Sequence, residues 1–424
     1  MDAMPPLGML PRREAGGLTP PAARLVRSLS LGVFLQWAGA GAILPLLPLY
    51  VRGRGGSDVV VGGVMAGFFA TAFVFEYGAG RLADRWSRVP VVVAGMAVDA
   101  LGTVLFLLPG PAALDVVFRA LQGAGAGASG VAALAMITRA VPMSHRGRAV
   151  GRIYGAQLGG LAIGPVFGSV AGLGAMRALF VAAAVALVVA IVPVLRAEPP
   201  AGVDPVAARE ATGGPRSGER PDDRRGADAL TGTLLAGALI GLTTGVYESC
   251  WTLLLTRHGA AQWEIGLSWT LFALPFALMS RPGGWLADHL DRRWLAVGAI
   301  GWAAAFCAGY PFLPSVVLLL ALGVAEACGA AVAFPACQSL LGEGTSAGYH
   351  GRAQGLFAAS QTGATAVAAA CAGVLFSTAP WLPFVSVAGI CVAGMALVAF
   401  VWRKVPGRVV PRVGSAVAGS RGES

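Results

Sequence analysis

Long apolar stretches fill most of this 424-residue chain, and short polar segments separate them. A helix that crosses about 30 Å of hydrocarbon, rising 1.5 Å per residue, needs about 20 apolar residues. Twelve stretches reach this length, so the pattern predicts an all-α integral membrane protein with twelve transmembrane helices. They lie near residues 28–51, 58–79, 89–109, 112–138, 149–172, 176–195, 230–256, 263–282, 294–313, 315–341, 353–376 and 381–402.

The composition agrees with this interpretation. Hydrophobic residues make up 56% of the chain and charged residues 12%, and the mean hydropathy is +0.70. A soluble fold cannot bury so much apolar surface. The six cysteines lie singly in apolar stretches and the four histidines show no ligand spacing, so we expect neither a metal nor a cofactor.

The arginines predict the orientation. Twenty basic residues fall in the short segments and tails on one side, whereas the segments on the other side hold only Arg52, Arg54, Arg177 and Arg257. Because basic residues accumulate on the cytoplasmic side, both termini are predicted to be cytoplasmic in a bacterial inner or plasma membrane. The net charge of +10 then reflects helix ends and lipid contact, and nucleic acid is not expected as a partner.

Three segments lie outside the apolar stretches. Residues 196–229 mix arginines and acids with proline and glycine, a composition typical of a flexible linker. The chain is therefore divided into an N-terminal tail, a six-helix bundle, a cytoplasmic linker, a second six-helix bundle and a C-terminal tail. Their predicted bounds are 1–27, 28–195, 196–229, 230–402 and 403–424.

The two predicted bundles repeat each other at an offset of 204 residues. Asp84 matches Asp288 (288 − 84 = 204), and Arg148 matches Arg352 (352 − 148 = 204). Further pairs at this offset include Phe68/Phe272, Gly80/Gly284, Arg88/Arg292, Gly159/Gly363 and Gln157/Gln361. A duplicated half in a very apolar chain predicts two pseudo-symmetric bundles and is typical of a transporter whose pathway lies between the repeats.

The loop after the second apolar stretch carries a recognisable motif, Gly80-Arg81-Leu82-Ala83-Asp84-Arg85-Trp86-Ser87-Arg88. It resembles cytoplasmic motif A of the major facilitator superfamily, and residues 284–293 form a weaker copy. Both copies depart from the family pattern where Ser87 and Asp291 replace a glycine. The resemblance implies a conformational latch, with Asp84 facing the start of the eleventh helix near Arg352. The latch residues would be Gly80, Asp84, Arg85, Arg88, Gly284, Asp288 and Arg292.

The fourth stretch contains Arg119 in the segment Arg-Ala-Leu-Gln-Gly-Ala-Gly, which resembles motif B of the same family. An arginine inside an apolar helix costs about 2.5 to 3.5 kcal/mol on insertion scales, so Arg119 needs a partner. The resemblance implies a role in proton transfer, and a structural ion pair is the alternative.

The fifth stretch contains Gly160, Gly164, Pro165 and Gly168, a segment that resembles motif C of the antiporter branch. The same glycines also predict a close packing seam between helices. The second half has no copy of motifs B and C, because Arg119 corresponds to Gly323 and Gly164-Pro165 to Ala368-Ala369.

Four acids lie inside predicted helices: Glu76, Asp99, Glu248 and Glu326. Buried carboxyl groups can alternate between protonated and ionised forms, which proton coupling requires. We assign proton coupling to Arg119, Glu248, Glu326 and Asp99, with Asp99 equally open to a structural role. Glu76 lies one turn from the second-stretch loop and is expected to pair with its arginines.

Aromatic and amide side chains accompany these acids. Aromatic rings beside a carboxylate suit a cationic or partly apolar ligand, although ordinary packing would also place them in these helices. The candidate substrate-binding residues are Gln36, Trp37, Gln122, Tyr154, Gln157, Tyr247, Trp251, Gln338 and Gln361.

The sequence thus predicts a secondary transporter, functional as a monomer, that exports small organic amphipathic compounds against protons by alternating access. A proton symporter or a uniporter that imports a small metabolite, such as a sugar or an organic acid, is the alternative. A membrane enzyme is not expected, because no cluster of catalytic residues is visible, and a transporter-like sensor or scaffold stays open.

Overall fold

A computed structural model describes residues 19–85, 88–141, 143–196, 223–343 and 350–405 of the chain. The described residues form helices and connecting turns, without a strand. The first bundle consists of α1 (Pro20–Ile43), η1 (Leu44–Leu46), α2 (Leu47–Gly53), α3 (Asp58–Arg85), α4 (Arg88–Leu105), α5 (Leu114–Ala140), α6 (Met143–Ala171), η2 (Leu173–Ala175) and α7 (Met176–Leu195). The second consists of α9 (Asp223–Arg257), α10 (Gln262–His289), α11 (Arg292–Gly309), η3 (Tyr310–Phe312), α12 (Val316–Glu343), α13 (His350–Thr378) and α14 (Leu382–Trp402).

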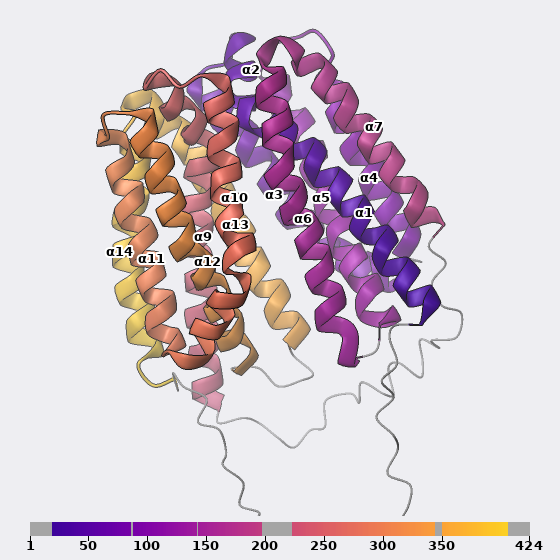
Figure 1. Cartoon of the computed structure of the whole chain (residues 1–424), viewed down its shortest axis with the longest axis vertical. Helices are drawn as coiled ribbons and strands as arrows, with labels where there is room; N and C mark the ends of the chain where they lie inside the picture. The colour runs from indigo at the N-terminus through magenta and orange to yellow at the C-terminus, as the bar shows by residue number, and fades with distance from the viewer. Residues whose placement is uncertain (1–18, 86–87, 142, 197–222, 344–349, 406–424) are drawn as a thin grey trace, which may run out of the picture.

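Within the described part of the chain, these elements make twelve helical rods in two groups of six, because α1, η1 and α2 run on as one rod. Figure 1 shows the two groups side by side, the first in indigo to magenta and the second in rose to yellow. Of the described rods, ten are long and apolar enough to cross a membrane, and α4 has a shorter apolar part, Val89–Leu105. The prediction of an all-α membrane protein with two six-helix bundles is confirmed.

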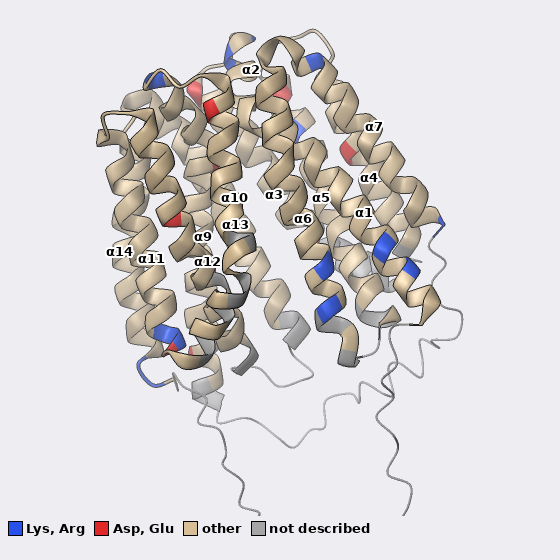
Figure 2. Ribbon diagram, in the orientation of Figure 1, with Lys and Arg blue, Asp and Glu red and all other residues tan. Residues whose placement is uncertain are grey.

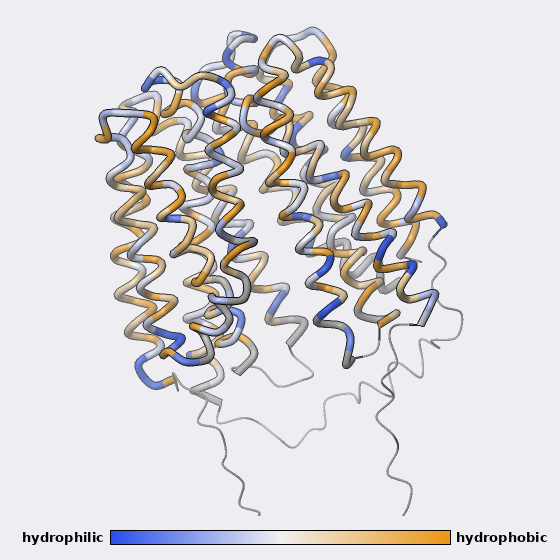
Figure 3. The backbone as a smooth tube through the Cα atoms, in the orientation of Figure 1, coloured by the Kyte–Doolittle hydropathy of each residue, from blue (hydrophilic) through white to orange (hydrophobic). Residues whose placement is uncertain are grey.

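The surface is apolar along the helices and charged at their ends. Large apolar side chains such as Phe167, Val170 and Val317 are 67–75% exposed, which is the reverse of a water-soluble protein. Figure 3 shows the apolar residues running along the rods, and Figure 2 shows most of the charged residues near the two ends of the bundles. This distribution matches a bilayer that surrounds the middle of both bundles.

Small residues determine how closely the helices of one bundle approach. A Cβ atom added to Gly164 would lie 2.5 Å from the backbone oxygen of Ala38, and one added to Gly168 would lie 1.8 Å from that of Ala42. A Cβ atom added to Gly160 would lie 2.7 Å from the backbone nitrogen of Ala38 in α1, and Pro165 lies inside α6 next to these glycines. The predicted packing seam is therefore the crossing of α6 with α1.

The two bundles touch through glycine as well. We call the end at which α1 begins and α14 ends the inner end, and the opposite end the outer end. Near the outer end, a Cβ atom on Gly373 of α13 would lie 2.3 Å from the backbone oxygen of Asp58 in α3, and one on Gly62 would lie 2.9 Å from Gly373. Two hydrogen bonds add to this seam, from Thr252 to the Pro45 carbonyl and from the Leu173 amide to Gln262.

Toward the inner end, glycines on the helices α6 and α13 do not contact the other bundle in this way. Cβ atoms added to Gly151 and Gly155 of α6, or to Gly355 of α13, would meet nothing within 4 Å. Next to them, Tyr154 and Leu356 are 45% and 49% exposed. In Figure 1 the ribbons of the two bundles converge at the outer end and diverge toward the inner end. Among the described residues, the closest backbone approaches between the bundles therefore lie toward the outer end.

A cap closes the loop between α10 and α11. Asp291 accepts hydrogen bonds from the backbone amide and the guanidinium group of Arg293, and so caps the N-terminus of α11. Arg293 also donates to the carbonyl oxygens of Trp402 and Val405 at the end of α14. This gives a structural reason for an aspartate where the family motif has glycine.

Candidate substrate cavity and buried charges

A network of polar side chains lies inside the first bundle. The Gln36 amide donates to Asp99 at 2.8 Å, which links α1 to α4, and both residues are buried. In α5, Arg119 donates to Gln122 at 2.8 Å, and Gln122 donates to the Thr103 hydroxyl at the same distance. These side chains, with Trp37, surround a small cavity of about 30 Å³.

Arg119 is only partly satisfied within this network. Its guanidinium carbon lies 4.3 Å from the centre of the Phe68 ring, a cation–π contact, while its Nε is buried without a hydrogen-bond partner. Arg119 interacts electrostatically with Asp99 in its own bundle and with Glu248 of α9 in the other. The structure therefore brings together three of the four residues assigned to proton coupling.

Glu248 is the counterpart of Arg119 across the bundle interface. Its Oε2 atom is buried and has no hydrogen-bond partner. Burying an unsatisfied carboxylate is costly, so this group needs a proton, a cation or the Arg119 charge to be stable. Glu248 can therefore bind a proton, bind a cation, or be stabilised by the charge of Arg119.

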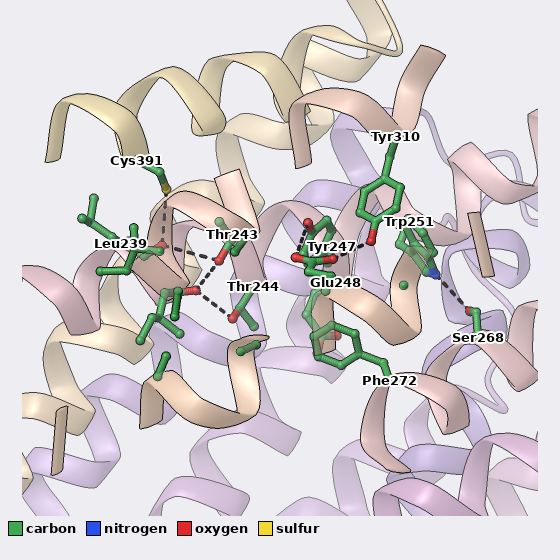
Figure 4. A pocket seen from close by; sticks show the side chains of 18 of the residues that line it. Leu239, Thr243, Thr244, Tyr247, Glu248, Trp251, Ser268, Phe272, Tyr310 and Cys391 are labelled. Carbon is green, nitrogen blue, oxygen red and sulfur yellow. Dashed lines mark hydrogen bonds between the residues drawn. The ribbon is translucent and has the colours of Figure 1, made fainter. Parts of the chain in front are cut away.

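A larger cavity of about 260 Å³ lies within the second bundle. Every helix from α9 to α14 contributes to its wall, which is mainly apolar. Its polar groups include Glu248, Glu326, Thr243, Ser268 and Gln361, and Figure 4 shows many of these side chains around the cavity. No basic residue occurs among the described residues that line it.

Two tyrosines hold Glu326 at the wall of this cavity. Tyr247 donates to Oε1 at 2.8 Å and Tyr310 donates to Oε2 at 2.7 Å (Figure 4). The Tyr247 and Tyr310 rings both pack edge-on against Trp251, and the Trp251 indole donates to Ser268 at 2.9 Å. The predicted residues Glu326, Tyr247 and Trp251 thus belong to one cluster.

The other predicted binding residues lie apart from this cluster. Gln338 of α12 accepts a hydrogen bond from Gln354 of α13. Tyr154 and Gln157 lie on the inner half of α6, Tyr154 exposed and Gln157 half-buried. Of the two amides at matched repeat positions, Gln157 and Gln361, only Gln361 lines the large cavity.

The latch residues are largely outside the described part of the chain. The structure does not describe the side chains of Gly80, Asp84, Arg85, Arg88, Gly284, Asp288 or Arg352. Arg292, the first residue of α11, is buried. Glu76 of α3 accepts a hydrogen bond from Thr362 of α13 and so joins the two bundles, a contact that the sequence did not indicate.

Several cavity residues escaped the sequence analysis. Tyr310 lies in the short helix η3 at the end of the ninth apolar stretch, where a tyrosine is usually an interfacial anchor. Trp269, whose indole Nε1 is buried without a partner, and Ser268 lie in α10 without a charged neighbour in sequence. Only the offset of 204 points to this region, because it pairs Phe272 of the cavity with Phe68 beneath Arg119.

Comparison with known proteins agrees with this architecture. The family model described as Major Facilitator Superfamily matches residues 29–257 and 233–420, which together cover most of the chain. The chain belongs to the major facilitator superfamily. It is thus a membrane transporter by family, and its duplicated halves are the two bundles of that fold.

Curated relatives within the superfamily match part of the chain. Multidrug resistance protein 2 of Bacillus subtilis is 28% identical over 160 residues, which is 38% of this chain and 40% of the relative. The inner membrane transport protein YajR of Escherichia coli is 31% identical over 182 residues, 42% of this chain and 40% of the relative. The match therefore spans two-fifths of the length of each relative.

Solved structures share the fold over nearly the whole chain. A bacterial homologue of the human lysosomal transporter Spinster, in an inward-facing and occupied conformation, aligns with a TM-score of 0.73 at 16% identity. The alignment covers 93% of this chain and all of the homologue. At this identity the likeness establishes the fold alone.

Proposed function

We propose that this transporter exports small organic amphipathic compounds in exchange for protons, by alternating access. The observation that carries the proposal is a pair of carboxylates on the wall of an apolar cavity without a described basic residue: Glu326, which is buried, and Glu248, which is half-buried with an enclosed Oε2 atom. An apolar cavity binds the body of an amphipathic compound, and a carboxylate that gains or loses a proton couples that binding to a proton gradient.

The direction of transport rests on three supports. The bundles pack most closely toward the outer end, so with cytoplasmic termini the structure corresponds to the state in which an exporter takes up its compound from the cytoplasm. The segment Gly160, Gly164, Pro165, Gly168 resembles the motif of the antiporter branch. A curated relative carries the name Multidrug resistance protein 2. Together they favour export.

The arrangement suggests an order of events. A compound enters the second-bundle cavity from the inner end while Glu248 is ionised. The bundles then rock about the region of Arg119 and Glu248, so the outer seam opens and the inner ends approach. A proton from outside neutralises Glu248, which weakens its hold on the compound, and the compound leaves. The return step carries the proton inward, and Arg119 stabilises the carboxylate once the proton has left.

The remaining roles follow the family resemblance. The latch residues around Asp84 and Asp288 would hold the inner ends together once the outer seam opens. The protein would act as a monomer in the bacterial cell membrane, with both termini in the cytoplasm.

Reconstituted transport tests this function. The purified protein in proteoliposomes with an imposed pH gradient should move protons when a lipophilic cation, a neutral antibiotic or a sugar is a substrate. Glu248→Gln should abolish gradient-driven transport while exchange of labelled substrate for unlabelled substrate persists, because the glutamine binds no proton. Glu326→Gln should likewise impair gradient-driven transport, because it removes the second carboxylate of the cavity.

A matched control is available outside the cavity. Glu264 caps α10 by accepting from the Ala261 amide, and glutamine preserves such a cap, so Glu264→Gln should leave coupling unchanged. Proton movement in the same direction as the substrate would identify a symporter. Transport that is independent of the gradient would identify a uniporter, and either result would overturn the proposal.

A further inference from the structure

The internal repeat relates the two cavities residue by residue. At the offset of 204, residues around the small cavity of the first bundle correspond to residues around the large cavity of the second. The corresponding pairs are Gln36/Ile240, Phe68/Phe272, Asp99/Ala303, Arg119/Gly323, Gln122/Glu326 and Ala126/Ala330. The two cavities are therefore the same place in the two copies of the repeat.

The difference in volume follows from these pairs. In the first bundle, the Arg119 side chain and the Gln36–Asp99 pair fill the space and leave about 30 Å³. In the second bundle, Gly323 has no side chain, Ala303 is short, and the cavity measures about 260 Å³. A Cβ atom added to Gly323 would meet nothing within 4 Å, so the space beside this glycine is open.

The first bundle also shows which chemistry suits this place. There the Arg119 guanidinium lies 4.3 Å from the centre of the Phe68 ring and donates to Gln122 at 2.8 Å. The second bundle repeats the phenylalanine as Phe272 and replaces the amide acceptor with the carboxylate of Glu326. The acceptor has become stronger, while the arginine that used it has been lost.

We propose that the second-bundle cavity binds a planar organic cation, an amidinium or guanidinium group on an apolar body, at the place that corresponds to the Arg119 guanidinium. This proposal rests on the proposed function, since it specifies the class of compound that the exporter carries. The cation lies between Gly323 and Glu326 on the Phe272 side of the cavity, and the apolar body lies along Trp251 and Trp269.

The two acids have distinct roles in this arrangement. The Glu326 carboxylate has acceptor positions beyond those used by Tyr247 and Tyr310, because an ionised carboxyl group accepts about four hydrogen bonds. The two hydroxyls keep it oriented before a ligand arrives. Glu248 lies on the wall of the same cavity, where its carboxylate adds a second negative charge that favours a cation.

The size of the cavity limits the ligand. Its volume of about 260 Å³ lies just below the range of about 300 to 1,000 Å³ for pockets that enclose drug-sized molecules. A single aromatic ring with one amidinium group is suitable, and larger compounds would extend toward the inner end between the bundles.

Binding of benzamidinium to the full-length protein in detergent tests the inference. Trp251 and Trp269 line the cavity, so their fluorescence reports occupation, and calorimetry gives the affinity. Benzamide has the same shape without the charge, and it should bind at least about tenfold more weakly than benzamidinium. Glu326→Gln should reduce the affinity for benzamidinium by a similar factor and leave that for benzamide unchanged.

A substitution at Gly323 tests the correspondence with Arg119 directly. Gly323→Arg supplies a tethered guanidinium, which should occupy the place next to Glu326 and abolish benzamidinium binding. Gly323→Met is the control of similar length without charge, and it should reduce the affinity for benzamidinium and benzamide by the same factor. Size-exclusion profiles and unfolding temperatures establish that each variant is folded.

Specific results would overturn the inference. Equal affinity for benzamidinium and benzamide in the unsubstituted protein would show that the cavity does not select a cation, even if Gly323→Arg fails to fold. Equal losses of benzamidinium binding in Gly323→Arg and Gly323→Met would exclude a role for the charge. Selective binding without proton antiport would refute the proposed function alone, whereas proton antiport of a neutral compound without selective binding would refute this inference alone.

Discussion

The glycine seam at the outer end should control the balance between the two states of the transporter. A Cβ atom on Gly373 would lie 2.3 Å from the backbone oxygen of Asp58, whereas ordinary contact begins at 3.4 Å. In Gly373→Ala the two helices must therefore separate by about 1.1 Å (3.4 − 2.3 = 1.1). Overpacking of this kind costs about 1 to 3 kcal/mol. Since the clash exists only while the outer ends are together, the ratio of the outer-open state to the outer-closed state should rise by roughly 5- to 150-fold.

Spin-label distances measure this shift. Labels at Gly174 of the first bundle and Ser377 of the second, in a protein without its six native cysteines, report the separation of the outer ends. Gly373→Ala should transfer population to a longer distance. Gly355→Ala is the control on the same helix, because a Cβ atom there meets nothing within 4 Å. An unchanged distribution in Gly373→Ala, or an equal shift in Gly355→Ala, would refute the reasoning.

Three further predictions concern stability. Tyr310→Phe removes one of the two hydroxyls that donate to Glu326, so it should destabilise the protein by about 1.5 to 3 kcal/mol, as measured by unfolding temperatures. In the Tyr310→Phe protein, the further change Glu326→Gln should cost less stability than it does in the unsubstituted protein, because the two side chains interact. Gly168→Ala should lower the yield of folded protein in size-exclusion chromatography, because its Cβ atom would lie 1.8 Å from a backbone oxygen of α1. Asp291→Asn should cost at most about 1 kcal/mol, because asparagine can still cap the helix and the ion pair that it removes is partly exposed to solvent. The Arg293 guanidinium lowers the pKa of Asp291, so the ionised carboxylate stabilises the folded state. The unfolding temperature of the variant should therefore be lower than that of the parent by a constant amount above about pH 4, and the two should converge at lower pH as Asp291 is protonated.

The fold could be predicted from the sequence because the membrane limits what an apolar stretch can do. The stretch at 176–195 is the clearest case, since α7 spans Met176–Leu195. With no water to satisfy backbone groups in the bilayer, a stretch of this length must be helical. The offset of 204 then grouped the helices into two bundles without any knowledge of their contacts.

The candidate site was less predictable because it depends on contacts between distant residues. The acids Glu248 and Glu326 were identifiable from their cost in an apolar helix. Their surroundings were not, because Tyr310 reaches Glu326 from another helix and Arg119 faces Glu248 from the other bundle. The offset did pair Arg119 with Gly323, but the open space beside this glycine required coordinates.

The glycines at Gly62 and Gly373 have a thermodynamic consequence for a seam that must part and rejoin in every cycle. When long side chains meet at an interface, each loses about 0.5 to 1.5 kcal/mol of rotamer entropy on closure. A glycine has no rotamers to lose, so backbone can meet backbone here at little entropic cost. The free energies of the open and closed seam therefore stay close together, which suits a contact that has to be made and broken reversibly.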